Sequence, residues 1–265
     1  MSTQDTVLIT GGAGGLGKSA SLILANYGWH VFAADFDEAA LEEIGQEKNI
    51  TPIRLDVTDT SSVEAAAEEV AKAVDGLNGI VNFAGILAIG SMIEIKEETL
   101  ARLMDVNFMG MYRVNKAFFD LVRNRTGRIV NISSEVARLS GLPFNGSYCI
   151  SKHAVEAYSD ALRREVGILG VSVIKIQPGP FKTDMVSGME RRFQQAVDES
   201  KLFKKQLSKV KYLAIKENSK AHAPGIVAES VHKALTVAKP AIAYSVKADL
   251  ARSVVGYLPH RLVDG

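Results

Sequence analysis

A glycine-rich turn near the N-terminus constrains the fold of this chain more than any other stretch. Residues 10–19 read TGGAGGLGKS; they follow the apolar run 7–9 and lead into helix-like sequence that ends near Tyr27. A strand, a glycine turn and a helix in this order bind phosphate. The glycines let the backbone approach an anion, and the helix N-terminus supplies free N–H groups with partial positive charge. We therefore expect a nucleotide at this turn.

The spacing of the glycines fits three patterns. Gly12, Gly14 and Gly17 match the GxGxxG dinucleotide fingerprint, whereas residues 12–19 match the GxxxxGK[ST] phosphate loop of nucleotide triphosphatases. The third pattern, TGxxxGxG, is met by Thr10, Gly11, Gly15 and Gly17. The turn alone leaves open a triphosphatase, a dinucleotide enzyme and a turn that serves only the fold.

The composition favours one domain without a nucleic-acid partner. The chain has 265 residues, 47% of them hydrophobic, which is enough for one large α/β core. Its 31 basic and 30 acidic residues give a net charge of +1, so no overall field attracts nucleic acid.

The expected compartment follows from what the sequence lacks. Cys149 is the only cysteine, which precludes an intrachain disulfide or a cysteine-rich metal site and fits a reducing compartment. The first strand begins within a few residues of the N-terminus without a charged and apolar leader. No apolar run approaches the roughly 20 residues that span a bilayer. We expect a cytoplasmic protein with no transmembrane segment and no metal site.

Apolar runs that alternate with helical patterns predict a parallel sheet. The predicted strands are 7–9, 30–34, 50–55, 79–83, 128–132, 171–176 and 241–245. After the first helix, the predicted helices are 37–46, 61–74, 99–123, one that starts near Tyr148 and runs to about Leu169, and 225–238. Right-handed crossovers between such strands give a doubly wound α/β fold, with about seven parallel strands and helices on both faces.

Candidate functional residues follow the predicted strands. They are Gly11, Gly15, Gly17, Asp35, Asp56, Gly85, Ser134 and Thr183. Ligands of a doubly wound fold bind at the carboxyl ends of its strands, so these residues should share one edge of the sheet.

Asp35 ends the second predicted strand, where a dinucleotide fold places the acidic residue that binds the adenosine ribose hydroxyls. Its charge would repel a 2′-phosphate and so favours NAD over NADP, whereas Lys18 is a weak indication of NADP. Asp35 could instead cap the helix 37–46. In a triphosphatase, Asp35 or Asp56 would be the magnesium ligand.

Tyr148 and Lys152 are one helical turn apart, so the phenol and the ammonium lie on one face. Moving a tyrosine pKa from about 10 to near 7 takes roughly 4 kcal/mol. One lysine at ~4 Å in an effective dielectric of ~20 supplies energy of that order. The pair can therefore serve as general acid and base. Asn107 interrupts the helix 99–123 as a poor helix former, with a structural or a functional role.

Taken together, these motifs resemble those of the short-chain dehydrogenase/reductase family from Thr10 to about Thr183, and more loosely to the C-terminus. The matching motifs are the cofactor loop Thr10-Gly11-x-x-x-Gly15-x-Gly17, the adenine contact Asp56-Val57, the NNAG motif Asn82-Phe83-Ala84-Gly85 and the turn Pro178-Gly179-x-x-x-Thr183. The catalytic tetrad is matched by Asn107, Ser134, Tyr148 and Lys152. The resemblance implies a single-domain Rossmann fold and an NAD-dependent oxidoreductase.

The resemblance also implies which residues bind the dinucleotide. They are Gly11, Gly15, Leu16, Gly17, Asp35, Asp56, Val57, Asn82, Ala84, Gly85, Tyr148, Lys152, Pro178, Gly179 and Thr183.

Each member of the tetrad has an implied role. Tyr148 would exchange a proton with the substrate oxygen, and Lys152 would lower the pKa of Tyr148 and bind the nicotinamide ribose. Ser134 would position the substrate oxygen, and Asn107 would hold a water that links Lys152 to solvent.

The sequence departs from the family pattern at two points. Phe83 replaces the second Asn of NNAG, with little effect expected on the chemistry. Ser134 lies one residue farther from Tyr148 than the usual spacing, where Glu135 would fall, so Ser133 is the alternative serine.

The segment 184–224 corresponds to the substrate lid of family members, and the tail 246–265 resembles tails of branches that act on lipophilic alcohols. Met185, Met189, Phe193 and Val197 recur at every fourth position and predict one apolar stripe. The neighbouring cations predict a solvated face or a contact with an acidic substrate group. They are Arg191, Arg192, Lys201, Lys204 and Lys205.

The sequence therefore predicts an NAD-dependent alcohol dehydrogenase or carbonyl reductase for a lipophilic secondary alcohol or ketone, such as a steroid, a retinoid or a long-chain alcohol. It is expected to form a homodimer or homotetramer, because the Asn107 and Tyr148 helices commonly pair in this family. The competing hypotheses are a P-loop phosphotransferase or triphosphatase, and a regulator that binds a dinucleotide without turnover.

Overall fold

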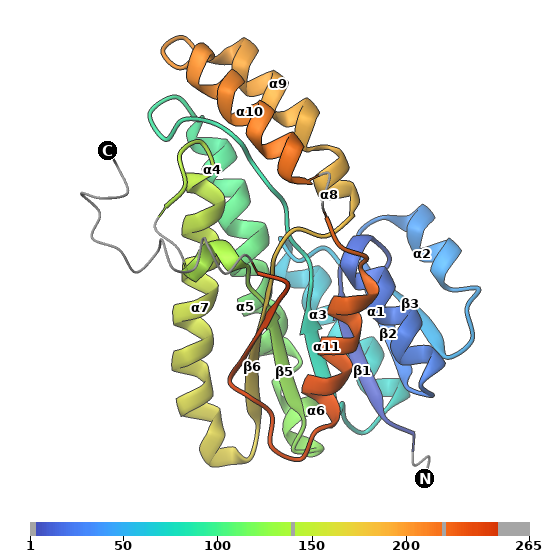
Figure 1. Cartoon of the computed structure of the whole chain (residues 1–265). Coiled ribbons are helices and arrows are strands. Elements are labelled where there is room, and N and C mark those ends of the chain that lie inside the picture. The colour runs from blue at the N-terminus through green and yellow to red at the C-terminus, as the bar shows by residue number, and fades with distance from the viewer. Residues whose placement is uncertain (1–3, 139–140, 219–220, 249–265) are drawn as a thin grey trace.

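Seven parallel strands form one sheet in the order β3-β2-β1-β4-β5-β6-β7 (Figure 1). The computed structural model describes residues 4–138, 141–218 and 221–248. The strands are β1 Thr6–Thr10, β2 His30–Asp35, β3 Ile50–Arg54, β4 Gly79–Asn82, β5 Arg128–Ile132, β6 Ser172–Pro178 and β7 Ala243–Val246. Every strand pair is parallel, which confirms the predicted sheet. The last strand begins two residues later than predicted.

Helices connect the strands and continue beyond β6. The α-helices are α1 Gly15–Asn26, α2 Glu38–Ile44, α3 Thr60–Ala73, α4 Glu97–Met104, α5 Met111–Ala117, α6 Phe119–Asn124, α7 Gly146–Val166, α8 Asp184–Ser187, α9 Met189–Glu199, α10 Lys204–Asn218 and α11 Gly225–Thr236. Asp105–Gly110 form one π-helical turn, and Glu135–Arg138 and Gly167–Leu169 form 3₁₀ turns. None of the helices described is long and apolar enough to span a bilayer.

The sheet is apolar on both faces because alternate residues of each strand point to opposite sides. Val7 and Ile9 pack with buried residues of α1, α2 and α11, whereas Leu8 packs with those of α3, α5 and α7. Figure 1 shows α7 and α11 on opposite sides of the central strands. Helices on both faces confirm the doubly wound α/β fold.

The continuous helix predicted for residues 99–123 is wrong. It is divided into α4, a π turn and the short helices α5 and α6. The Asn107 side chain accepts a hydrogen bond from Ile86 N–H (2.7 Å) and donates one to the Ile86 carbonyl (2.9 Å). These contacts hold Asn107 toward the neighbouring loop, at a π turn of the kind that is frequent at functional sites.

The connection order places a crevice beside β1. The chain first adds β2 and β3 on one side of β1 and then returns to add β4 on the other side. Such a switch point is where doubly wound folds bind ligands, at the carboxyl ends of the strands. Gly11 follows β1 there, and a Cβ on Gly11 would lie 3.0 Å from the Ala84 nitrogen after β4.

Helices α9 and α10 lie side by side above this edge (Figure 1). Phe193, Ala196 and Leu207 are the buried members of the small apolar cluster between them. The apolar stripe predicted at four-residue spacing is divided between α8 and α9. The predicted tail lies mostly outside the described residues, which end at 248.

Candidate active site

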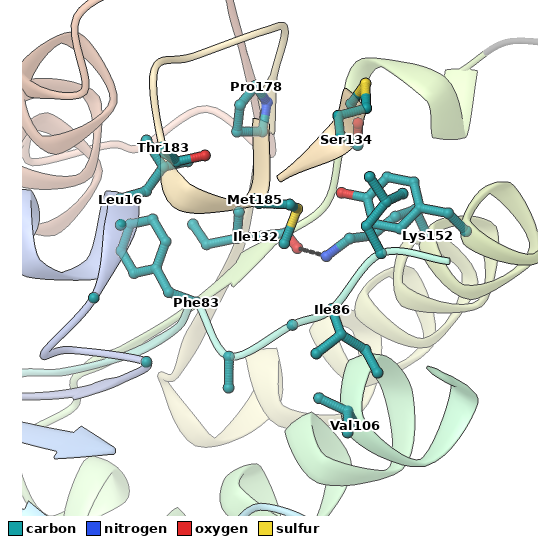
Figure 2. Close-up of a pocket in the computed structure, with 18 of the residues that line it drawn as sticks. Leu16, Phe83, Ile86, Val106, Ile132, Ser134, Lys152, Pro178, Thr183 and Met185 are labelled. Carbon is teal, nitrogen blue, oxygen red and sulfur yellow. Dashed lines mark hydrogen bonds between the residues drawn. The ribbon is translucent and has the colours of Figure 1, made fainter. Parts of the chain in front are cut away.

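A cavity of about 1890 Å³ runs along the carboxyl ends of the strands. It is lined by all the predicted cofactor-binding and catalytic residues except Asn82 and Asn107. Figure 2 shows how residues far apart in the sequence meet there: Leu16 and Phe83 lie near Thr183, and Ser134 lies across from Lys152. The strand-end residues therefore share one site.

The glycine turn has the backbone that a phosphate cradle requires. Gly11 and Gly15 have φ angles of +65° and +49°, in the left-handed region that favours glycine. A Cβ on Gly17 would collide with the Gly11 carbonyl, whereas one on Gly14 would meet open space. The first-turn N–H groups of α1 have no acceptor within the helix and adjoin the cavity, so the turn fits a dinucleotide pyrophosphate.

Lys18 does not serve this turn. Its ammonium pairs with Glu43 of α2 at 2.7 Å. The phosphate-loop hypothesis needs that ammonium over the bound phosphates, so the structure does not support it. The same pairing removes the weak indication that Lys18 gave for NADP.

Asp35 lies at the end of β2 with its carboxylate toward the glycine turn. It accepts hydrogen bonds from Phe36 N–H (2.8 Å) and Ala13 N–H (3.3 Å). The helix cap considered for Asp35 is made by Asp37, whose side chain accepts from Ala40 N–H at 3.1 Å. Asp35 therefore does not cap α2, and it lines the cavity.

The Asp56-Val57 loop is held by the π turn that carries Asn107. Arg113 donates to the Val57 carbonyl (3.1 Å) and pairs with Asp105 (2.7 Å). Gly110 approaches so closely that a Cβ there would lie 2.8 Å from the Val57 side chain. The role of Arg113 was missed in the sequence, where no motif marks it.

The side chain of Asn82 does not face the cavity. Its amide donates to Asn115 (2.8 Å) and Asn131 (2.9 Å) in a buried polar network between β4, β5 and α5. Asn82 is not among the residues that line the cavity, and its buried Oδ1 has no hydrogen-bond partner among the described residues.

Tyr148, Lys152 and Ser134 form the chemical centre of the cavity. Lys152 is buried and Tyr148 is half-buried, and the Lys152 ammonium lies 5.7 Å from the centre of the Tyr148 ring. That ammonium donates to the Ile132 carbonyl at 2.8 Å (Figure 2). Ser134 forms a hydrogen bond with Tyr148. Among the described residues, the buried Ser133 Oγ has no hydrogen-bond partner.

Without a bound dinucleotide, the pKa of Tyr148 is raised and not lowered. Burial raises the pKa of Tyr148 to about 12, and the Ser134 hydrogen bond opposes this only in part. Burial lowers the pKa of Lys152 to about 8. Desolvation is the largest cause of both shifts, because it disfavours the charged form of each group.

Asn107 contacts α7, the helix that carries Tyr148 and Lys152. Besides its two bonds to Ile86, its amide donates to Ser151 Oγ at 3.1 Å. The sequence did not identify Ser151 or the Ile132 carbonyl, since an interior helix serine and a backbone oxygen carry no motif.

The comparisons with known proteins agree with this geometry. Residues 5–193 match the family model for short chain dehydrogenases. The chain belongs to the short-chain dehydrogenase/reductase family. It is 35% identical to retinol dehydrogenase 7 of Mus musculus and 34% identical to 17-beta-hydroxysteroid dehydrogenase type 6 of Homo sapiens, in each case over 97% of this chain and 86% of the relative.

Solved structures share the fold at lower identity. A short-chain dehydrogenase/reductase from Burkholderia phymatum in complex with NAD has a TM-score of 0.81 at 23% identity, over 98% of this chain and 94% of that one. One from Burkholderia cenocepacia in complex with NADP has a TM-score of 0.77 at 22% identity, over 99% and 97%. Family membership makes the chain an oxidoreductase that uses NAD(P).

Proposed function

We propose that this family member transfers a hydride between NAD and a lipophilic secondary alcohol or ketone. The observation that carries the proposal is a tyrosine, Tyr148, that is hydrogen-bonded to Ser134 and lines one cavity with the glycine turn. The named activities of the relatives, on retinol and on hydroxysteroids, support the lipophilic class.

The walls of the cavity beyond Tyr148 favour an apolar substrate. They are formed by Leu87, Ile89, Val136, Leu142, Phe181, Met185, Met189, Phe193, Val210 and Leu213. An apolar ligand gains about 25 cal/mol for each Å² that these walls remove from water, whereas a short polar alcohol gains little. Residues 184–224 are proposed to act as the lid of this cavity.

The proton is handled by the chain's own residues. A bound nicotinamide would supply the hydride or accept it. At neutral pH Tyr148 holds its proton, so it can donate to a substrate carbonyl oxygen when the ketone is reduced. Ser134, which is hydrogen-bonded to Tyr148, would orient that oxygen. Lys152 donates to the Ile132 carbonyl, and it would bind the nicotinamide ribose and favour the phenolate during alcohol oxidation.

We propose NAD as the preferred dinucleotide because of Asp35. Its carboxylate lies at the end of β2 beside the glycine turn, and it would repel the 2′-phosphate of NADP. The remaining cofactor contacts are proposed for the residues that line the cavity, without the side chain of Asn82.

A homodimer or homotetramer is proposed for the assembly. Met109, Tyr112 and Ile150 are partly exposed on the π turn, α5 and α7, where a second copy would cover them.

A cytoplasmic location is proposed from the single cysteine, which fits a reducing compartment.

Turnover tests the proposal directly. NADH formation at 340 nm is followed with a steroid alcohol, a long-chain secondary alcohol and a short polar alcohol. We expect turnover of the lipophilic alcohols, and a loss of at least about 100-fold in Tyr148→Phe. Tyr158→Phe is the control, since Tyr158 lies on the same helix and bonds Asn115 outside the cavity. Equal rates in the two variants would remove Tyr148 from the chemistry.

A further inference from the structure

The lid helix α10 presents a basic and apolar outer face. Residues 200–216 contain six lysines and no acidic residue, in a chain whose net charge is only +1. The inner side of α10 is occupied, because Leu207 is buried against α9, and Lys211 donates to Gln194 (2.8 Å). The outer lid face, defined here as Lys205, Ser208, Lys209, Tyr212 and Leu213, lines one shallow surface pocket.

Large apolar side chains on this face are left in water. Tyr212 is 68% exposed and Leu213 is 61% exposed. Lys205 and Lys209 share the face with them at helical spacing, and neither forms an ion pair within the described part of the chain. A face that served only to be solvated would not need Tyr212 and Leu213 one turn beyond Lys209.

We propose that the outer lid face docks on an anionic phospholipid surface. Lysines contact acidic headgroups while their carbon chains remain at the interface, and a tyrosine beside them sits with its ring in the apolar layer and its hydroxyl in water. Each lysine near such a surface contributes about 1 kcal/mol, which is a factor of about five in binding. With two lysines and two apolar anchors, docking is reversible and salt-dependent.

The position of α10 connects docking with the cavity. Leu213 belongs to the outer lid face and also lines the main cavity. Val210 and Ala214 of the same helix line the cavity as well. Figure 1 shows α9 and α10 at one end of the molecule, beyond the edge of the sheet. A docked lid would place the mouth of the cavity at the lipid, so that an apolar substrate could enter without crossing water. This last step rests on the proposed function, whereas docking itself does not.

Vesicle sedimentation without substrate tests docking. The wild-type protein is mixed with vesicles of phosphatidylcholine alone or with added phosphatidylserine, at low and at high salt. We expect binding only to the anionic vesicles, and its loss at high salt, because salt screens exposed charges. Lys205→Gln combined with Lys209→Gln should weaken this binding at least about tenfold.

Two further variants identify the face and the partner. Lys72→Gln with Lys239→Gln removes the same charge from exposed sites elsewhere and should leave binding unchanged. Tyr212→Ser should weaken binding to vesicles but not to poly-glutamate, which has charge and no apolar layer.

No binding to anionic vesicles, equal binding to uncharged ones, or an equal loss in the control overturns the proposal. An intact Tyr212→Ser interaction with vesicles would favour an acidic protein as partner instead. Failed docking would leave turnover of dissolved alcohols untouched, so the two proposals fail separately.

Discussion

At the scale of single residues, the buried ammonium of Lys152 lowers the free energy of unfolding. Its ammonium is buried with one hydrogen bond, to the Ile132 carbonyl, and burial lowers its pKa from 10.5 to about 8. That difference corresponds to about 3 kcal/mol against the charged form. This destabilisation of the fold is fully present below pH 8, where Lys152 of the folded protein is charged. It falls as the pH rises toward 10.5, because only the unfolded chain then still binds the proton.

Lys152→Met should therefore stabilise the fold while it removes activity. The Ile132 carbonyl loses its donor, at about 1 kcal/mol, so a net gain of about 2 kcal/mol is expected at pH 7. Denaturant unfolding at pH 7 and at pH 10 measures it, and the advantage should shrink at the higher pH. The raised pKa of Tyr148 affects both proteins alike. A variant that is less stable at pH 7, with no change in the difference at pH 10, would contradict this account.

The two neighbouring serines should respond differently to truncation. Ser134→Ala removes the hydrogen bond to Tyr148, and we expect kcat to fall about 100-fold, as when one donor at a reacting oxygen is lost. Ser133→Ala is the matched control. It replaces a buried hydroxyl with no partner among the described residues, so activity should stay near wild type. A larger loss in Ser133→Ala would move the catalytic role by one residue.

At the scale of elements, the π turn between α4 and α5 joins two halves of the site. Asn107 faces Ile86 and Ser151, while Asp105 pairs with Arg113, which also donates to the Val57 carbonyl beside the cavity. Arg113→Gln should free the Val57 loop and weaken NADH binding by about 1 kcal/mol, or roughly fivefold to tenfold. The kcat at saturating NADH should be unchanged.

Arg123→Gln is the control for this change. Arg123 pairs with Asp120 on the surface of α6, where an ion pair contributes little. NADH fluorescence titrations of the two variants and the wild type compare the affinities directly. Equal dissociation constants for Arg113→Gln and Arg123→Gln would show that the loop does not depend on Arg113.

The strands were predictable from the sequence, and the π turn was not. Runs such as 30–34 and 128–132 are apolar because both faces of the sheet are covered, and that pattern needs no knowledge of partners. Asn107 indicated only that the helix 99–123 was disturbed. The form of the disturbance depends on Ile86, which lies 21 residues away in the sequence. The helix propensity of a short stretch of sequence does not reveal such a long-range contact.

At the scale of the whole molecule, topology brought the candidate residues together. Gly11, Asp35, Ser134 and Thr183 follow different strands, and parallel strands end at one edge, so their shared cavity followed from the sequence. The orientation of Asn82 into the interior and the high pKa of Tyr148 did not. Both depend on burial of the side chain by residues that are far apart in the sequence. Asn82, for example, is surrounded by Asn115 and Asn131.

We propose that the cavity binds a dinucleotide and that Asp35 sets a preference for NAD. The measurement that tests it most directly is a fluorescence titration with NADH and with NADPH, for the wild type and Asp35→Ala, with ATP and magnesium as competitor. We expect tighter binding of NADH than of NADPH, a smaller difference in Asp35→Ala, and no effective competition by ATP and magnesium. Equal affinities in the wild type, or binding of ATP and magnesium without any dinucleotide affinity, would contradict it.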